Sequence, residues 1–392
     1  EMKLFNAALL SVALTITAGA PGVFAATPDN MLVVAQNIDD IVAIDPAQAY
    51  EFSSGEFVTN VYDRLVQYDA EDTTVLAPAL ASSWSVDDAN KTITFTMREG
   101  VKFHSGNPVT AADAEFSLRR AIILNKTPAF ILSQFGFTAD NVAQTIVADG
   151  NRLSITTDKK YATSFVLNCL TSTIGGIVDM KTVMANEADG DMGNTWLKTN
   201  SAGSGAYKVV SWKPNESVTL QANEEFYKGA PAMKRVIVRH VQESATQRLL
   251  LEKGDIDVAR NLNPEDIAGA SKSADIAIDD ELRGRLMYFS LNQKHPELSK
   301  PKVRQAMKYL VDYEGMQNSF LKGQYTIHQA FLPRTYLGEI DDKPFKMDVE
   351  KAKAMLAEAG VKGFEIEVGV REAQERIEIA QSLQNTMAKA GI

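Results

Sequence analysis

Residues 92–117 read TITFTMREGVKFHSGNPVTAADAEFS and carry the clearest structural signal in the chain. Residues 92–98 alternate apolar and polar side chains, a pattern that predicts a half-buried strand. The SGNP motif at residues 105–108 predicts a turn. Thr110 and Asp113 then have the spacing of a capping box, which predicts the start of a helix. A strand, a turn and a capped helix are therefore all encoded locally.

Both strands and helices are expected along the rest of the chain. Alternating or short β-rich runs predict strands at residues 218–220, 236–238, 255–259, 287–291 and 364–370. Helical spacing, capping residues and glycine stops predict helices at residues 242–253, from 264 onward, and at 303–310, 349–359 and 377–387. This mixture indicates the α/β or the α+β class.

The N-terminus has the features of a secretory signal peptide, assigned to residues 1–25. Lys3 supplies a positive charge, and residues 4–17 are mostly apolar or small. Small residues then follow at the end of this segment, which predicts cleavage after Ala25 or Ala26. The alternative is a membrane anchor, but the apolar run is shorter than the roughly 20 residues that a membrane span needs. The mature protein is therefore expected outside the cytoplasm, in the periplasm.

The composition is that of a soluble globular protein, with 45% hydrophobic residues in a chain of 392. The net charge of −10 argues against a nucleic-acid partner, because such proteins meet phosphates with basic patches. Cys169 is the single cysteine, so an internal disulfide is excluded. We expect it to be a small buried hydrophobe.

The sequence lacks the common catalytic and metal-binding motifs. None of the four histidines lies three or four residues from another, so the zinc-helix motif is absent. A phosphate-binding loop and a Gly-x-Ser-x-Gly elbow are also missing. These absences argue against an enzyme, and we expect neither a cofactor nor a metal site. We expect His104 to be a turn residue rather than a ligand.

Several blocks of sequence resemble one family of transport proteins. The strongest is LAPALASSW at residues 76–84 followed by residues 92–117. Further blocks agree in order: DP at 45–46, VYDRLV at 61–66, GSGAYKV at 203–209, GDIDVA at 254–259, LN at 291–292 and KVRQAM at 302–307. The chain differs from the usual residues at Arg64, Ser105, Ala114 and Ala206. It resembles the bacterial extracellular solute-binding proteins of family 5, which serve ABC importers of peptides and nickel.

This resemblance implies an α/β fold of the type II periplasmic-binding-protein kind, in which two lobes enclose a ligand. The implied division is residues 26–50 and 186–284 for the core of lobe I, 51–185 for an extra subdomain and 285–392 for lobe II. A strand over residues 285–292 would cross between the lobes. Family members usually continue past the last helix, so the C-terminal part of lobe II is expected to be missing from this sequence.

The resemblance also implies a function. An extracytoplasmic receptor of this family captures a peptide or similar small solute by hinge closure and delivers it, as a monomer, to the permease and ATPase of the importer. An opine, a nickel chelate or an oligosaccharide is an alternative cargo. An extracytoplasmic hydrolase and a receptor that feeds a sensor are less favoured alternatives.

Candidate ligand-binding residues come from four segments. Tyr50 and Phe52 follow the DP motif, and Arg371, with Arg376 as its rival, follows the last expected strand, where a guanidinium would suit a carboxylate. The complete set is Tyr50, Phe52, Gly203, Ser204, Gly205, Ala206, Tyr207, Arg260, Asn261 and Arg371.

Overall fold

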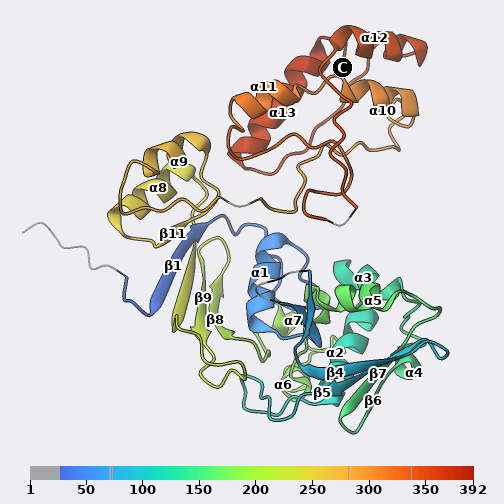
Figure 1. Cartoon of the computed structure of the whole chain (residues 1–392), viewed down its shortest axis with the longest axis vertical. Helices are drawn as coiled ribbons and strands as arrows, with labels where there is room; N and C mark the ends of the chain where they lie inside the picture. Colours follow the sequence, from blue (N-terminus) through green and yellow to red (C-terminus); the bar gives the residue numbers. More distant parts are fainter. Residues whose placement is uncertain (1–26, 70–71, 73, 281, 337) are drawn as a thin grey trace, which may run out of the picture.

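A computed structural model describes residues 27–69, 72, 74–280, 282–336 and 338–392. The signal peptide expected at residues 1–25 lies outside the described residues. The described chain contains two larger sheets and a two-stranded sheet in its N-terminal part, and a group of helices in its C-terminal part, from residue 285 onward (Figure 1).

The first sheet has five strands in the order β11-β1-β10-β9-β8. Strand β1, the second in this order, runs parallel to both neighbours, whereas the pairs β10–β9 and β9–β8 are antiparallel. Parallel strands are usually covered on both faces, which agrees with the apolar run MLVVAQ of β1. The strands are β1 (Met31–Gln36), β8 (Tyr207–Lys213), β9 (Ser217–Ala222), β10 (Arg235–His240) and β11 (Val258–Ala259).

The second sheet is antiparallel, in the order β4-β5-β7-β6, and helix α2 (Ala111–Leu124) packs on its strands β6 and β7. Buried Phe95, Leu153 and Leu118 join this sheet and helix in one core. The strands are β4 (Ala81–Asp87), β5 (Thr92–Met97), β6 (Ile146–Asp149) and β7 (Arg152–Thr156), and a hairpin of β2 (Val66–Tyr68) and β3 (Leu76–Pro78) lies beside them.

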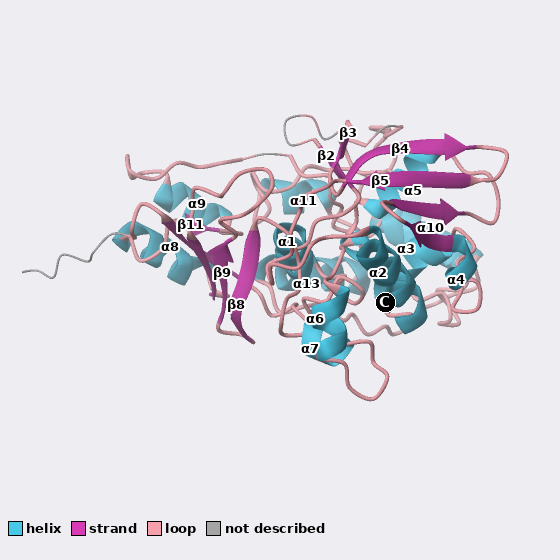
Figure 2. Cartoon of the chain, turned by 90° about the horizontal axis from the view of Figure 1, so that it is seen from below, coloured by secondary structure: helices cyan, strands magenta, loops and turns pink. Residues whose placement is uncertain are grey.

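Helix α1 (Phe52–Val61) stands between the two sheets (Figures 1 and 2). It buries Ser54, Phe57, Val58 and Val61, which share one face at helical spacing. Phe57 and Val61 belong to the core of the first sheet. Shorter helices surround this region: η1 (Thr127–Ala129), α3 (Phe130–Ser133), α4 (Val142–Thr145), α5 (Thr163–Leu170), η2 (Thr173–Gly175), α6 (Met180–Ala185) and α7 (Asn194–Leu197).

Several helix ends lie where the capping residues and the glycine stop predicted them. Thr110 and Asp113 form the expected capping box of α2. Helix α8 (Ser244–Lys253) ends at Gly254, whose φ of 76° is in the left-handed region that glycine tolerates. Helix α9 (Pro264–Ala270) begins after Asn263, whose side chain accepts from the Asp266 N–H at 2.8 Å.

The C-terminal part is helical wherever it has regular structure. Its elements are α10 (Pro301–Lys308), α11 (Tyr313–Asn318), α12 (Val349–Glu358) and α13 (Gln374–Ala388). They enclose a separate core that contains Val303, Leu310, Leu356 and Leu383. The division of the chain into lobes stays a prediction.

Two expected strands do not form. Residues 285–292 and 364–370 have no strand pairing in the described structure. Their alternating side chains still pack, because Phe289, Leu291 and Phe364 lie against the core of the C-terminal helices. A strand also needs a neighbour that completes its hydrogen bonds, and residues 285–392 supply none among their described residues. The strand expected over 255–259 forms only over its last two residues, as β11 (Val258–Ala259).

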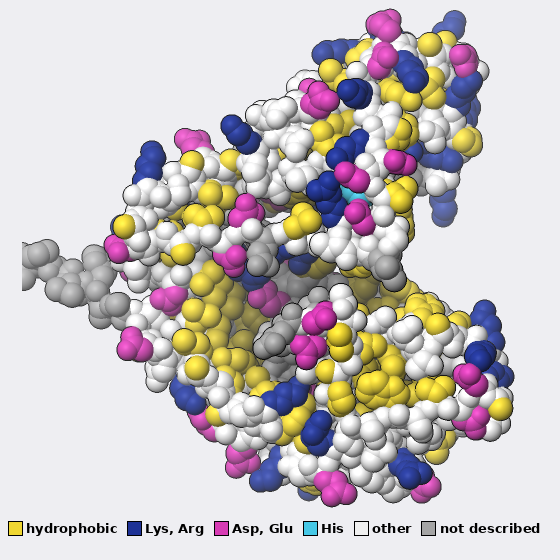
Figure 3. Space-filling model, in the orientation of Figure 1, with side chains coloured by type: hydrophobic (Ala, Val, Ile, Leu, Met, Phe, Trp, Pro, Cys, Tyr) yellow, Lys and Arg dark blue, Asp and Glu magenta, His cyan; other side chains and the backbone are white. Residues whose placement is uncertain are grey.

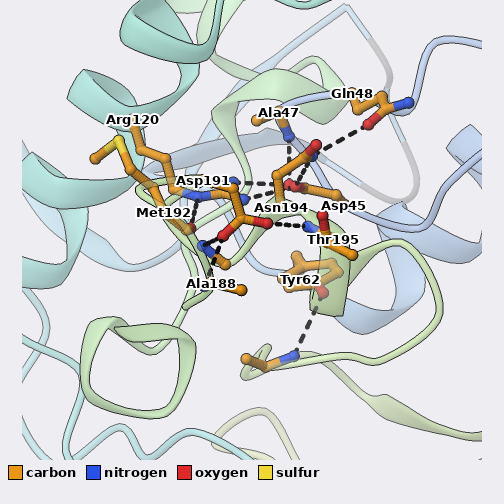
Figure 4. A network of polar contacts seen from close by, with 12 residues as sticks. Asp45, Ala47, Gln48, Tyr62, Arg120, Ala188, Asp191, Met192, Asn194 and Thr195 are labelled. Carbon is orange, nitrogen blue, oxygen red and sulfur yellow. Dashed lines mark hydrogen bonds and ion pairs between the residues drawn. The ribbon is translucent and has the colours of Figure 1, made fainter. Parts of the chain in front are cut away.

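A buried ion pair joins the segment before α1 to helix α2 (Figure 4). The Arg120 guanidinium donates to both oxygens of Asp45, at 2.8 and 2.6 Å, and its Nε donates to the Met192 carbonyl at 2.7 Å. Asn194 of α7 donates to the same carboxylate at 2.7 Å. Asp45 and Arg120 are 0% and 1% exposed, so each charge depends on the other for compensation.

Arg120→Met is expected to lower the free energy of unfolding by about 3–5 kcal/mol, because it leaves the Asp45 charge buried without its partner. Urea unfolding monitored by circular dichroism measures this loss. Lys160→Gln is the matched control, since the Lys160–Asp88 pair is solvent-exposed and its loss should leave the midpoint nearly unchanged. An equal effect of both substitutions would contradict this role for Arg120.

Candidate functional site

A cavity of about 610 Å³ opens beside the first turns of α1. The hollow between the N-terminal part and the helices of the C-terminal part is visible in Figure 3. Segments far apart in the sequence line the cavity: Tyr50, Glu51, Phe52, Gly55, Glu56, Thr59, Asn60, Ile131, Thr171, Ser172, Thr173, Arg260 and Arg285. A concave site of this size, with aromatic walls and a few charged groups, is typical of small-molecule binding.

Two large aromatic side chains face solvent here instead of entering a core. Tyr50 is 50% exposed and Phe52 is 66% exposed. The Tyr50 ring meets the Phe130 ring edge-on, with 5.8 Å between the ring centroids. Exposed aromatics grouped around a cavity provide apolar contact area for a ligand. The structure thus brings these two predicted residues to the cavity wall.

Arg260 lines the cavity and forms an ion pair with Glu56 of α1. Its Nη1 lies 2.6 Å from Glu56 Oε1 and donates to Gln36 Oε1 at 2.9 Å. The backbone N–H of Arg260 also donates to Gln247 Oε1 at 2.9 Å. Asn261, the next residue, has a φ of 66°, in the left-handed region that asparagine tolerates, and it is not among the cavity-lining residues.

Arg285 is a cavity residue that sequence reasoning did not identify as a site residue. Its guanidinium carbon lies 4.0 Å from the centroid of the Phe52 ring, a cation–π contact. Burial lowers the pKa of Arg285, and the nearby charges of Arg283 and Arg260 lower it further. No motif marks this position, because its role depends on where the chain passes in space.

The segment from Gly203 to Tyr207 packs behind α1. A Cβ at Gly203 would meet the Val61 carbonyl oxygen at 2.0 Å, and one at Gly205 would meet the Asn60 carbonyl oxygen at 2.5 Å. Glycine is therefore required for the close approach of the two backbones. Among the described residues that line the cavity, this segment is not represented.

The individual contacts of this segment are structural. Ser204 Oγ donates to Asp63 Oδ2 at 2.9 Å, and Tyr207 Oη donates to the Met233 carbonyl at 3.0 Å. The Ala206 carbonyl accepts from the Asn223 N–H at 2.8 Å. Direct ligand contact by these residues stays a prediction.

Arg371 already has acidic partners. Its Nη2 lies 2.6 Å from Asp39 Oδ1, and its Nη1 lies 3.7 Å from Asp40 Oδ2. Arg376, the rival candidate, lies 3.9 Å from Glu375. A ligand carboxylate would have to compete with two aspartates for Arg371, and the ligand role proposed for that residue stays a prediction.

The family assignment rests on a match over most of the chain. Residues 75–392 match the model of bacterial extracellular solute-binding proteins, family 5 middle. The chain belongs to this family. The two-lobe periplasmic-binding-protein fold expected for it is confirmed by solved structures of the same architecture.

Three relatives illustrate the similarity. A probable D,D-dipeptide-binding periplasmic protein of Escherichia coli is 29% identical over 88% of this chain and 65% of its own length. The periplasmic binding protein DppA of Helicobacter pylori, in complex with the peptide STSA, has 25% identity and a TM-score of 0.81 over 92% of this chain and 72% of its own. AgaA of A. tumefaciens R10, in complex with agropinic acid, has 26% identity and a TM-score of 0.76 over 92% and 71%.

The chain thus spans less than two thirds of the length of the E. coli relative.

Among the described residues, no helix is both long and apolar enough to cross a membrane. The same part of the chain holds no group of three or more His, Cys, Asp or Glu side chains arranged to bind a metal ion.

Gly203→Ala is expected to lower the free energy of unfolding by about 1–3 kcal/mol or more, because its new methyl group collides with the α1 backbone. Differential scanning calorimetry measures the change. Gly369→Ala is the control, since a Cβ there meets no atom within 4 Å. If Gly203→Ala were as stable as the control, the close packing behind α1 would be disproved.

His104 is expected to make the protein less stable in mild acid. Its Nε2 donates to the Gly205 carbonyl at 2.9 Å, and burial lowers the pKa of His104 below the ordinary value of 6.5. As the pH falls through 6.5, His104 becomes protonated in the unfolded chain but stays neutral in the folded chain. The free energy of unfolding therefore falls. Urea unfolding at pH 7.5 and 5.5 should show a smaller loss for His104→Gln than for the wild type. Equal losses would rule this contribution out.

Proposed function

We propose that this protein is the extracytoplasmic substrate-binding component of an ABC importer and captures a peptide or a similar small solute by closure of two lobes. Its family consists of solute-binding proteins rather than enzymes. The observation that carries the proposal is the cavity lined by Tyr50, Phe52 and Arg260 from the N-terminal part and by Arg285 from the start of the C-terminal part. A ligand there contacts both parts of the chain.

Several contacts that join the two parts are polar and solvent-exposed, which supports a hinge. Arg371 pairs with Asp39, and Gln242 Nε2 donates to the Glu372 carbonyl at 3.1 Å. Exposed polar contacts contribute little net free energy, so water replaces them readily when the parts separate. A ligand that binds both parts then shifts the population toward the closed form.

The remaining elements of the proposal follow from this role. The receptor works as a monomer in the periplasm and delivers its ligand, chemically unchanged, to a permease and its ATPase. Non-peptide cargo is the second candidate, since a structural relative of 26% identity binds agropinic acid. An opine shares carboxylates and an amine with a dipeptide, so the same cavity suits both classes.

Ligand binding is expected to reduce the radius of gyration of the purified chain, measured by small-angle X-ray scattering with and without a solute that co-purifies from the producing cells. Mass spectrometry of the denatured protein identifies that solute. The control is the same chain after unfolding and refolding to strip the ligand. Identical scattering with every solute, and none retained through purification, would refute hinge capture.

A further inference from the structure

The cavity beside α1 contains a positive charge that has no ionic partner. Arg260 and Glu56 neutralise each other at 2.6 Å. Glu51, at the N-cap of α1, accepts from Ser54 Oγ at 3.2 Å, and a carboxylate is favourable at that end of a helix. The Arg285 side chain makes neither a hydrogen bond nor an ion pair with the described residues.

The position of Arg285 leaves its donors free. Its guanidinium rests on the Phe52 ring at 4.0 Å, and this contact uses the π face of the ring. None of the five N–H donors of the guanidinium is hydrogen-bonded to another described residue, whereas the backbone N–H of Arg285 donates to the Arg283 carbonyl at 2.7 Å. The aromatic contact therefore orients the group and leaves a planar donor edge that matches the two oxygens of a carboxylate.

The surrounding charges favour an anion at this place. Burial lowers the pKa of Arg285, the positive charges of Arg283 and Arg260 lower it further, and the Glu56 carboxylate offsets part of this shift. Arginine nevertheless stays protonated in proteins, so the repulsion is relieved by a bound anion rather than by loss of a proton. Glu56 is the nearby acid, and its carboxylate already pairs with Arg260.

We propose that Arg285 is the residue that recognises an anionic group, most simply a carboxylate, of the ligand, while Tyr50 and Phe52 contact an adjoining apolar portion. This inference rests on the proposed function and narrows it to small carboxylate-bearing solutes. Arg285 thereby takes the role that the sequence suggested for Arg371, which is paired with Asp39 and Asp40 instead.

The test uses the full chain and a panel of dipeptides and N-(carboxyalkyl) amino acids, offered with free carboxylates or with each carboxylate converted into a carboxamide. Native mass spectrometry and isothermal titration measure binding. The wild type is expected to bind free acids at least about 10-fold more tightly than their amides, and Arg285→Gln should remove that preference by weakening binding of the acids.

Arg283→Gln is the matched control, because it removes the same charge from an exposed neighbour that does not line the cavity. It should retain most of the preference. If the wild type binds acids and amides equally, or if Arg285→Gln binds the acids as tightly as the wild type, the Arg285 inference falls while the proposed function stands. If the wild type binds neither form of any compound, the proposed capture of these solutes is contradicted, and the inference falls with it.

Discussion

The ion pair between Asp45 and Arg120 is the interaction on which the placement of the cavity depends. Asp45 lies five residues before Tyr50 in the sequence, and the side chains of Asp45 and Arg120 are both almost fully buried. Two buried charges tolerate only a narrow set of positions, because either one alone would lack compensation. The pair therefore fixes where the chain enters α1, relative to the helix that supports the second sheet.

Helix α1 has two different sides because of what packs on each. Behind it, Gly203 and Gly205 allow a second backbone to approach its C-terminal turn, and His104 ties that backbone to the turn before α2. In front of it, the first turns carry exposed aromatic and acidic side chains into a cavity. The glycines Gly203 and Gly205 and the aromatic pair Tyr50 and Phe52 thus act on the same helix: the glycines allow its close packing, and the aromatic side chains face solvent.

The charges around α1 are partly neutralised within the cavity wall. The Arg260–Glu56 pair is internally neutral, so it shapes the wall without demanding a charged ligand. The Phe52–Arg285 contact combines apolar area with free donors in a small space. Such a combination suits a ligand with a charged end and an apolar end. The salt bridge of Arg371 to Asp39, by contrast, joins the two parts of the chain through solvent-exposed side chains, so it contributes little net free energy.

Features that depend on neighbouring residues could be predicted from the sequence: strand β5, the turn after it, the capped start of α2, the glycine stop of α8 and the motifs of the family. It also pointed to Tyr50, Phe52 and Arg260, which the fold brings to one cavity. Three features could be seen only in the folded chain. Residues 285–292 and 364–370 have no strand partner among the described residues, Arg371 pairs with aspartates, and Arg285 lies on the Phe52 ring. The physical reason is that hydrogen-bond partners and charge partners distant in sequence are chosen by packing, whereas caps, turns and periodicity are chosen by adjacent residues.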